Sequence, residues 1–260
     1  MMQVTGSNNI SSERASKSIL SIQLVQGGLY FSVCSDSKKI EGSGKLSYQM
    51  PNGSNDSDKL LKLLNIIYGD NPFLNYQYRK VNLVVDTPRV TPVPRSWVDK
   101  DNYADWLTYA GFMPLSHECV VVSQNFEQMA MIMPLDKQCD EFFKDKHGEA
   151  LNYVHPLEIL CAHNTNKSFM AVSIKGSGAY VVAAEKEKIK FMMPLVFKGD
   201  AEAIFCLRKL SEEFSSQPQL FYATTQPTMA KVLEWQFKGA VNLNKTMGDI
   251  PLFNVNNCRL

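Results

Sequence analysis

Two glycine-containing breaks in apolar runs are the residues best placed to do chemistry. The first lies in "IQLVQGGLYFSV" at 22–33 and the second in "VSIKGSGAYVVAA" at 172–184. Backbone N–H groups of a glycine turn can hold phosphate oxygens, but a tight hairpin turn needs glycine just as often. We interpret both breaks as hairpin turns and keep their residues as candidate anion-binding positions. These residues are Gly27, Gly28, Gly176, Ser177 and Gly178.

The other reactive residue types do not form a motif. None of the six cysteines forms a CxxC pair and the four histidines are scattered, so a zinc site is not indicated. A GxxxxGK[ST] phosphate loop is absent as well. Asp86 ends an apolar run and can either cap its strand, which we favour, or face a cleft. We therefore expect no catalytic residue, no metal and no cofactor.

The elements that position these turns follow the same order twice. In the first half, three strand-like runs precede a helix in "DKLLKLLNIIYG", for which Asp56 or Ser57 is the expected N-cap and Gly69 the expected end, and the strand "RKVNLVVDTP" follows. The second half predicts β-β-β-α-β-α-β, from "SFMAVSIK" to "GAVNL". Sequence identity between the halves is low, so the repeat is one of element order.

This order divides the chain into three parts. Residues 1–17 are polar and lack apolar periodicity, which predicts a flexible tail. Residues 18–165 form the first unit and residues 166–260 the second, with the boundary at the polar break Asn164–Lys167.

Three strands, a helix, a strand, a helix and a strand describe a ribonuclease-H-like unit, and two such units in tandem resemble the actin-like ATPases. More closely, the chain is similar to an uncharacterised bacterial domain-of-unknown-function family with that fold. The resemblance rests on "SIQLVQGGLYFSVCS", "RVTPVPRSW", "MAVSIKGSGAYVVAA" and "FKGDAEAIFCLRKL". It implies an α/β fold of two ribonuclease-H-like units, with mixed sheets flanked by helices.

The same resemblance implies particular nucleotide-binding residues. Actin-like ATPases carry an acid in each hairpin and a Gly-Gly pair at the adenosine. Here the first acid position falls at about Gln23 or Leu24, and the second at about Ser173 or Ile174. Ala223-Thr224-Thr225 stands where Gly-Gly is expected. Because Mg²⁺ is held mainly by carboxylates and phosphates, the glycine turns are interpreted as vestigial phosphate-loop positions.

Net charge, apolar segments and cysteine usage limit the partners and the location that we expect for this protein. The 260 residues have a formal net charge of +1, which argues against a nucleic-acid partner. The chain shows no signal peptide or apolar span of membrane length, and scattered cysteines favour a reducing compartment. We expect a cytoplasmic, non-catalytic actin-fold pseudoenzyme that binds or scaffolds a protein partner, with neither membrane nor nucleotide bound. The alternatives are a divergent ATPase or kinase, whose acids come from elsewhere, such as Asp86 or Asp200, and a small-molecule sensor.

Overall fold

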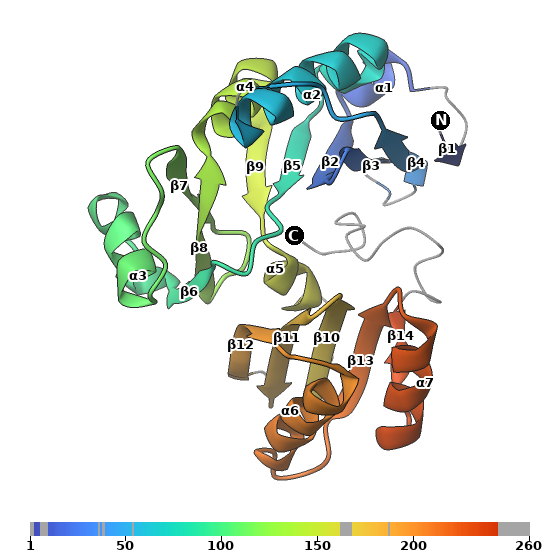
Figure 1. Ribbon diagram of the computed structural model, residues 1–260, viewed down its shortest axis with the longest axis vertical. Coiled ribbons are helices and arrows are strands. Elements are labelled where there is room, and N and C mark those ends of the chain that lie inside the picture. Colours follow the sequence, from blue (N-terminus) through green and yellow to red (C-terminus); the bar gives the residue numbers. More distant parts are fainter. Residues whose placement is uncertain are drawn as a thin grey trace. The chain divides into compact units, whose positions relative to one another are not determined.

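The computed structural model divides the chain into two compact units, each with its own sheet (Figure 1). Unit 1 runs to His155 and unit 2 begins at Pro156. The expected break at Asn164–Lys167 lies outside the described residues. The structure describes residues 3–5, 10–35, 37, 40–53, 55–161, 168–186 and 188–243.

Unit 1 is built on a six-stranded mixed sheet in the order β1-β4-β3-β2-β5-β9. β2, β3 and β4 form an antiparallel meander, and β2, β5 and β9 run parallel. The strands are β1 (Gln3–Thr5), β2 (Ser18–Val25), β3 (Gly28–Ser35), β4 (Ile40–Ser47), β5 (Lys80–Val84) and β9 (Leu151–Val154). The helices and 3₁₀ turns around it are α1 (Ser12–Ala15), α2 (Asp56–Asp70), η1 (Pro72–Asn75), α4 (Lys137–His147) and η4 (Gly148–Ala150).

Helices α2 and α4 pack against each other beside this sheet (Figure 1). α2 begins at the N-cap Asn55, whose side chain accepts a hydrogen bond of 2.8 Å from the backbone N–H of Asp58. The buried face of α2 includes Tyr68, whose ring meets Phe142 of α4 edge to face at 5.0 Å. This aromatic packing holds the two helices together.

A smaller sheet lies between β5 and α4 in the sequence. Its order is β6-β8-β7, all antiparallel, and α3 packs on it over Val93, Leu107 and Ile132. The elements are β6 (Thr91–Pro94), η2 (Arg95–Trp97), η3 (Lys100–Asn102), α3 (Tyr103–Tyr109), β7 (Glu118–Ser123) and β8 (Met129–Asp136). Unit 2 has no such insertion between its strand and its last helix.

Unit 2 contains a five-stranded sheet in the order β12-β11-β10-β13-β14. Its strands are β10 (Phe169–Lys175), β11 (Gly178–Glu185), β12 (Lys188–Val196), β13 (Gln219–Thr224) and β14 (Val241–Asn242). Its helices are α5 (Pro156–Cys161), α6 (Asp200–Glu212) and α7 (Pro227–Gln236). Helices α6 and α7 cover one face through a core that includes Leu207, Tyr222 and Leu233. α5 packs against β10 and β11, and so it joins unit 2 although the sequence places it in the first unit.

The polar N-terminal segment also differs from the expected tail. In its described part, β1 pairs antiparallel with β4, and α1 is capped by Ser11 and buries Ala15 completely. Strand pairing satisfies backbone groups without an apolar side-chain pattern, and so the polar composition gave no signal of it. Among the described residues, no helix is long and apolar enough to span a membrane.

Candidate functional site

The first glycine turn is fixed by the third strand of its own sheet. Val25 and Gly28 close the β2–β3 hairpin, and Gly27 has the left-handed φ of +72°. A Cβ on Gly28 would lie 1.9 Å from the carbonyl oxygen of Leu46. The backbone N–H of Tyr48 donates to the carbonyl of Gly27 over 2.8 Å. Strand pairing with β4 therefore accounts for Gly28, and the left-handed turn conformation accounts for Gly27.

The turn in unit 2 has the same pairing but a different backbone. Lys175 and Gly178 close the β10–β11 hairpin, and Gly176 has a φ of +58°. The residue with a left-handed backbone is thus the first of the two turn residues here (Gly176) and the second in unit 1 (Gly27). The backbone N–H of Phe197 donates to the carbonyl of Ser177 over 2.9 Å. The two turns share a place in the repeat, but not a common arrangement of backbone N–H groups.

A polar cluster lies at the carboxyl ends of the parallel strands of unit 1, an edge where α/β sheets often bind ligands. Gln23 of β2 is 5% exposed and pairs in register with Val84 of β5. Its side-chain amide donates a 2.9 Å hydrogen bond to the carboxylate of Asp86, just beyond β5. An amide thus stands near the expected acid position, and Asp86 accepts a hydrogen bond from it.

His155 completes this cluster from the end of β9. Its side chain is fully buried, and its Nε2 lies 3.0 Å from the carbonyl oxygen of Thr87. Because a carbonyl only accepts, Nε2 carries the proton in this contact. Burial lowers the pKa of His155 to about 4, against the opposing effects of the Thr87 hydrogen bond and the Asp86 charge. At neutral pH the imidazole is therefore uncharged and ties the ends of β5 and β9 together.

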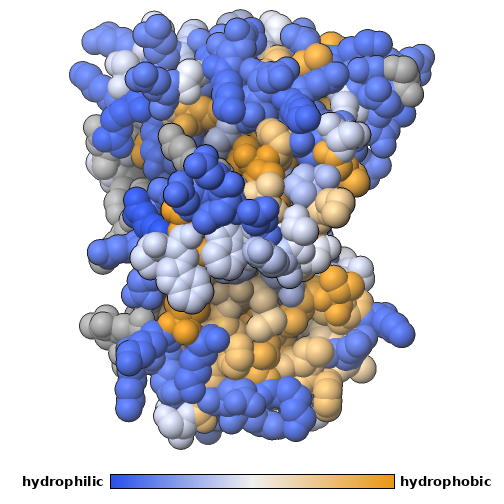
Figure 2. Space-filling model, turned by 90° about the vertical axis from the view of Figure 1, so that its left-hand side faces the viewer, coloured by the Kyte–Doolittle hydropathy of each residue, from blue (hydrophilic) through white to orange (hydrophobic). Residues whose placement is uncertain are grey.

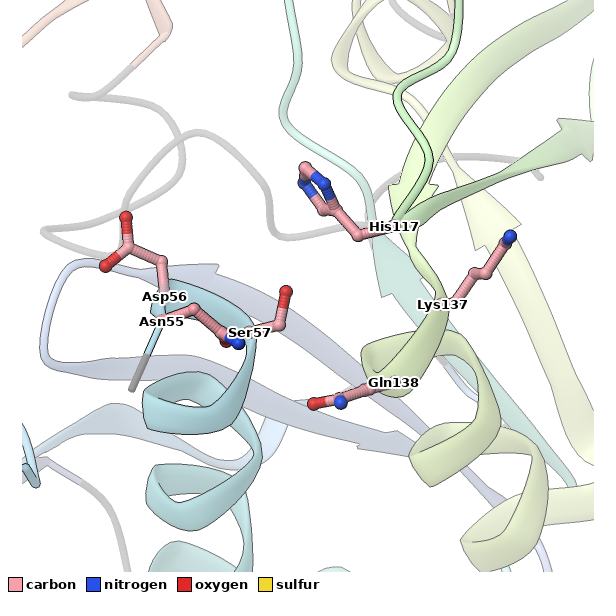
Figure 3. Close-up of a pocket in the computed structure, with 6 residues that line it drawn as sticks. All are labelled: Asn55, Asp56, Ser57, His117, Lys137 and Gln138. Atoms are coloured by element: carbon pink, nitrogen blue, oxygen red, sulfur yellow. The ribbon is translucent and has the colours of Figure 1, made fainter. Parts of the chain in front are cut away.

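A separate cavity of about 480 Å³ lies where the first turns of α2 and α4 meet (Figure 3). The hydroxyl of Ser57 donates to the carboxylate of Asp136, which also accepts from the N–H of Cys139 and so caps α4. Figure 3 shows the His117 ring on the strand side of the cavity and the Gln138 amide directed toward α2. The residues that line the cavity are Asn55, Asp56, Ser57, His117, Lys137 and Gln138.

The cavity has groups that can bind a small polar molecule, but its contacts do not describe an activated nucleophile. Ser57 bonds to a helix-capping carboxylate, and Lys137 donates to the carbonyl of Ser116 over 3.0 Å. The side-chain oxygen of Gln138 is buried without a hydrogen-bond partner. Within the described residues, no group of three His, Cys, Asp or Glu side chains could hold a metal ion.

The structure brings together only part of what the sequence singled out. Gln23 and Asp86 meet, whereas Asp200, the other acid considered for nucleotide chemistry, begins α6 in unit 2. His155 and the cavity residues were not identified as a site, because they come from separate segments without a common motif. The signals available in the sequence were the helix N-cap residues near Asn55 and Asp136.

Comparison with known proteins places the chain in a family. The sequence profile of the family "Protein of unknown function (DUF3822)" matches residues 7–219. The chain belongs to this family. No curated protein sequence matches it.

Solved structures agree on the fold. A Bacteroides thetaiotaomicron protein described as having an actin-like ATPase fold and unknown function is 18% identical, with a TM-score of 0.70 over 95% of this chain and 96% of that one. The PilM–PilN type IV pilus biogenesis complex contains a chain that is 12% identical, with a TM-score of 0.54 and 89% coverage of both. The ethanolamine utilization protein EutJ from Carboxydothermus hydrogenoformans is 9% identical, with a TM-score of 0.52, 90% coverage of this chain and 87% of that one. The chain therefore has the actin-like ATPase fold, as the sequence predicted.

Proposed function

We propose that this chain is a non-catalytic member of the actin-like fold that acts in the cytoplasm as a binding or scaffold module for another protein. The observation that carries the proposal is the hydrogen bond from the buried Gln23 to Asp86 at the strand ends of unit 1. A neutral amide supplies no negative charge, whereas Mg²⁺ and its water ligands are usually organised by carboxylates. The neighbouring carboxylate is already engaged by that amide.

The glycine turns support the same proposal. Gly28 is required by the close approach of β4, and Gly27 and Gly176 are favoured by their positive φ. Gly27, Gly28 and Gly176 are thus explained by backbone geometry, and a retained phosphate contact is not needed to account for these three. We regard Gly27, Gly28, Gly176, Ser177 and Gly178 as vestigial phosphate-loop positions.

Among proteins of similar fold, one precedent bears on a binding role. The PilM–PilN structure is, by its name, a complex of two proteins in type IV pilus biogenesis. A chain of this fold can therefore belong to a protein assembly, and we propose that this chain does so too, without nucleic acid, membrane or nucleotide as its ligand.

Thermal unfolding with and without Mg·ATP, ADP and GTP tests the proposal. A nucleotide at 100 times its Kd would stabilise the chain by about 2.7 kcal/mol. We expect no change in Tm with any of the three and no phosphate release from ATP. A reproducible rise in Tm, abolished in Asp86→Asn, would support the divergent ATPase instead, with Asp86 as its metal-organising acid.

A further inference from the structure

The outer strand β12 of unit 2 differs from the other sheet edges in the described residues. Those edges are shorter: β1 has three residues, β9 four, β14 two, β7 six and β6 four. β12 has nine residues and pairs on one side only, with β11. Natural proteins usually shorten or interrupt such edges, because unpaired backbone groups invite another strand.

From Phe191 to Val196 the side chains of β12 are apolar on both faces of the sheet, and Lys188 and Lys190 precede this stretch. Phe191 and Leu195 pack partly against the core beneath α6, while Val196 is 78% exposed. Met193 and Pro194 are partly exposed between them. Figure 2 shows apolar side chains gathered on unit 2, on the side where Figure 1 places β12. An added strand would therefore bury apolar surface as well as form backbone hydrogen bonds.

The direction of the backbone groups follows from one hydrogen bond. The N–H of Phe197 points to β11, where it donates to Ser177. Backbone groups alternate in direction along a strand, so in the β11–β12 register the N–H and carbonyl groups of Phe191, Met193 and Leu195 also point to β11. The open edge then presents the N–H groups of Met192 and Val196 and the carbonyls of Met192, Pro194 and Val196. Pro194 lacks an N–H and lies where strand proline is tolerated, at the outer edge.

We propose that β12 binds an extended, apolar segment of a different protein, which adds to the sheet of unit 2 as a further strand. The inference rests on the proposed binding function and names the class of partner. Strand addition takes its affinity from backbone bonds and its specificity from alternate side chains, and β12 offers both.

Pro194 favours a different protein over a second copy. In a twofold β12–β12 pairing that includes Pro194, each copy contributes one proline without a donor. One carbonyl in each copy is then left unpaired, whether the axis lies at Met193, Pro194 or Leu195. A partner strand that has no proline leaves one such carbonyl in the whole interface, because only one Pro194 is present.

A matched pair of variants tests the edge. Val196→Pro removes an outward N–H but no bond to β11, whereas Val196→Thr keeps both the N–H and the branched shape. The probe is a fluorescent, blocked seven-residue peptide of alternating valine and threonine, N-methylated at the threonines. It has one pairing edge and cannot stack into its own sheets. The same peptide N-methylated at every residue is the control, and circular dichroism verifies that both variants fold.

We expect saturable anisotropy changes with the wild type and Val196→Thr, at least about tenfold weaker binding to Val196→Pro, and no binding of the control peptide. Failure of the probe to bind the wild type, or equal binding by the two variants, would overturn the proposal. Sedimentation without peptide should show a monomer; a dimer that only Val196→Pro dissociates would make a second copy the occupant. The peptide experiments are done without nucleotide. A negative result at β12 therefore leaves the nucleotide test of the proposed function unaffected, and a negative nucleotide test leaves the β12 result unaffected.

Discussion

At the scale of single residues, the strand ends of unit 1 hold polar side chains that bond to one another. Gln23 donates to Asp86, and His155 donates to the carbonyl of Thr87, just beyond Asp86. Both Gln23 and His155 are buried. Buried polar groups stabilise a fold only when they are paired, so this cluster joins β2, β5 and β9 at the edge where α/β sheets often bind ligands.

His155 should make the stability of the chain depend on pH. Its pKa falls from the ordinary 6.5 to about 4 in the folded protein, so the unfolded chain binds more protons between these values. The stabilisation is present above pH 6.5 and is lost as the pH falls toward 4. When the pH is lowered from 7 to 5, the free energy of unfolding should fall by about 2 kcal/mol less in His155→Gln than in the wild type. Urea unfolding at both pH values measures the difference.

Glutamine keeps an N–H that can reach Thr87, so His155→Gln changes the proton linkage more than the packing. His147, whose pKa is also lowered to about 4 by burial, is present in both proteins and cancels in the comparison. Equal losses of stability in the two proteins would contradict a buried, neutral His155.

At the scale of elements, the two hairpins occupy equivalent places but tolerate different side chains. Gly28 and Gly178 each begin the second strand of their hairpin. A Cβ on Gly28 would collide with the Leu46 carbonyl at 1.9 Å, whereas on Gly178 it would meet the Leu195 carbonyl at an ordinary 3.5 Å. β4 therefore approaches its hairpin much more closely than β12 approaches the other.

This difference predicts unequal effects of one substitution. Gly28→Ala should lower the free energy of unfolding by at least about 2 kcal/mol, because the backbone of β3 or β4 must move. Gly178→Ala should change it by less than about 1 kcal/mol. Urea denaturation of the two variants beside the wild type makes the comparison, and similar values for both would contradict the close approach of β4.

The sequence was informative about elements because apolar runs and turn residues are local signals. The strands around both glycine turns, the helix α2 and the strand β5 after it all follow from such signals. Helix ends were less certain: α2 is capped by Asn55 instead of Asp56 or Ser57, and it continues through Gly69 to Asp70. Several residues near a helix start can act as caps, and the backbone decides among them.

Contacts between distant segments could not be predicted in the same way. Gln23 and Asp86 meet because β2 and β5 are parallel neighbours, which apolar patterns do not specify. The same holds for Ser57 and Asp136, which are brought together by the packing of α2 on α4. β1 could not be predicted from the polar residues 1–17 for a related reason: its pairing with β4 uses backbone groups, which leave no apolar pattern in the sequence.

At the scale of the whole molecule, the repeat gives each unit an internal core. The core of unit 2 is made of buried side chains from residues 170–237, contributed by its own strands and by α6 and α7. Leu207, Tyr222 and Leu233 are at most 1% exposed within it. A unit with a contiguous core of its own has the main requirement for folding alone, and a chain of about 90 residues is long enough to do so.

A fragment of residues 156–243 should therefore fold by itself. It retains α5, which packs on β10 and β11, together with the complete five-stranded sheet. We expect a mixed α/β circular dichroism spectrum and one cooperative urea transition, which Leu207→Ala should weaken by about 2–5 kcal/mol through loss of core packing. A fragment that binds 8-anilinonaphthalene-1-sulfonate and unfolds without a cooperative transition would show that the internal core of unit 2 is not sufficient. A cooperative fragment would mean that one copy of the repeated element order is enough to specify a stable sheet.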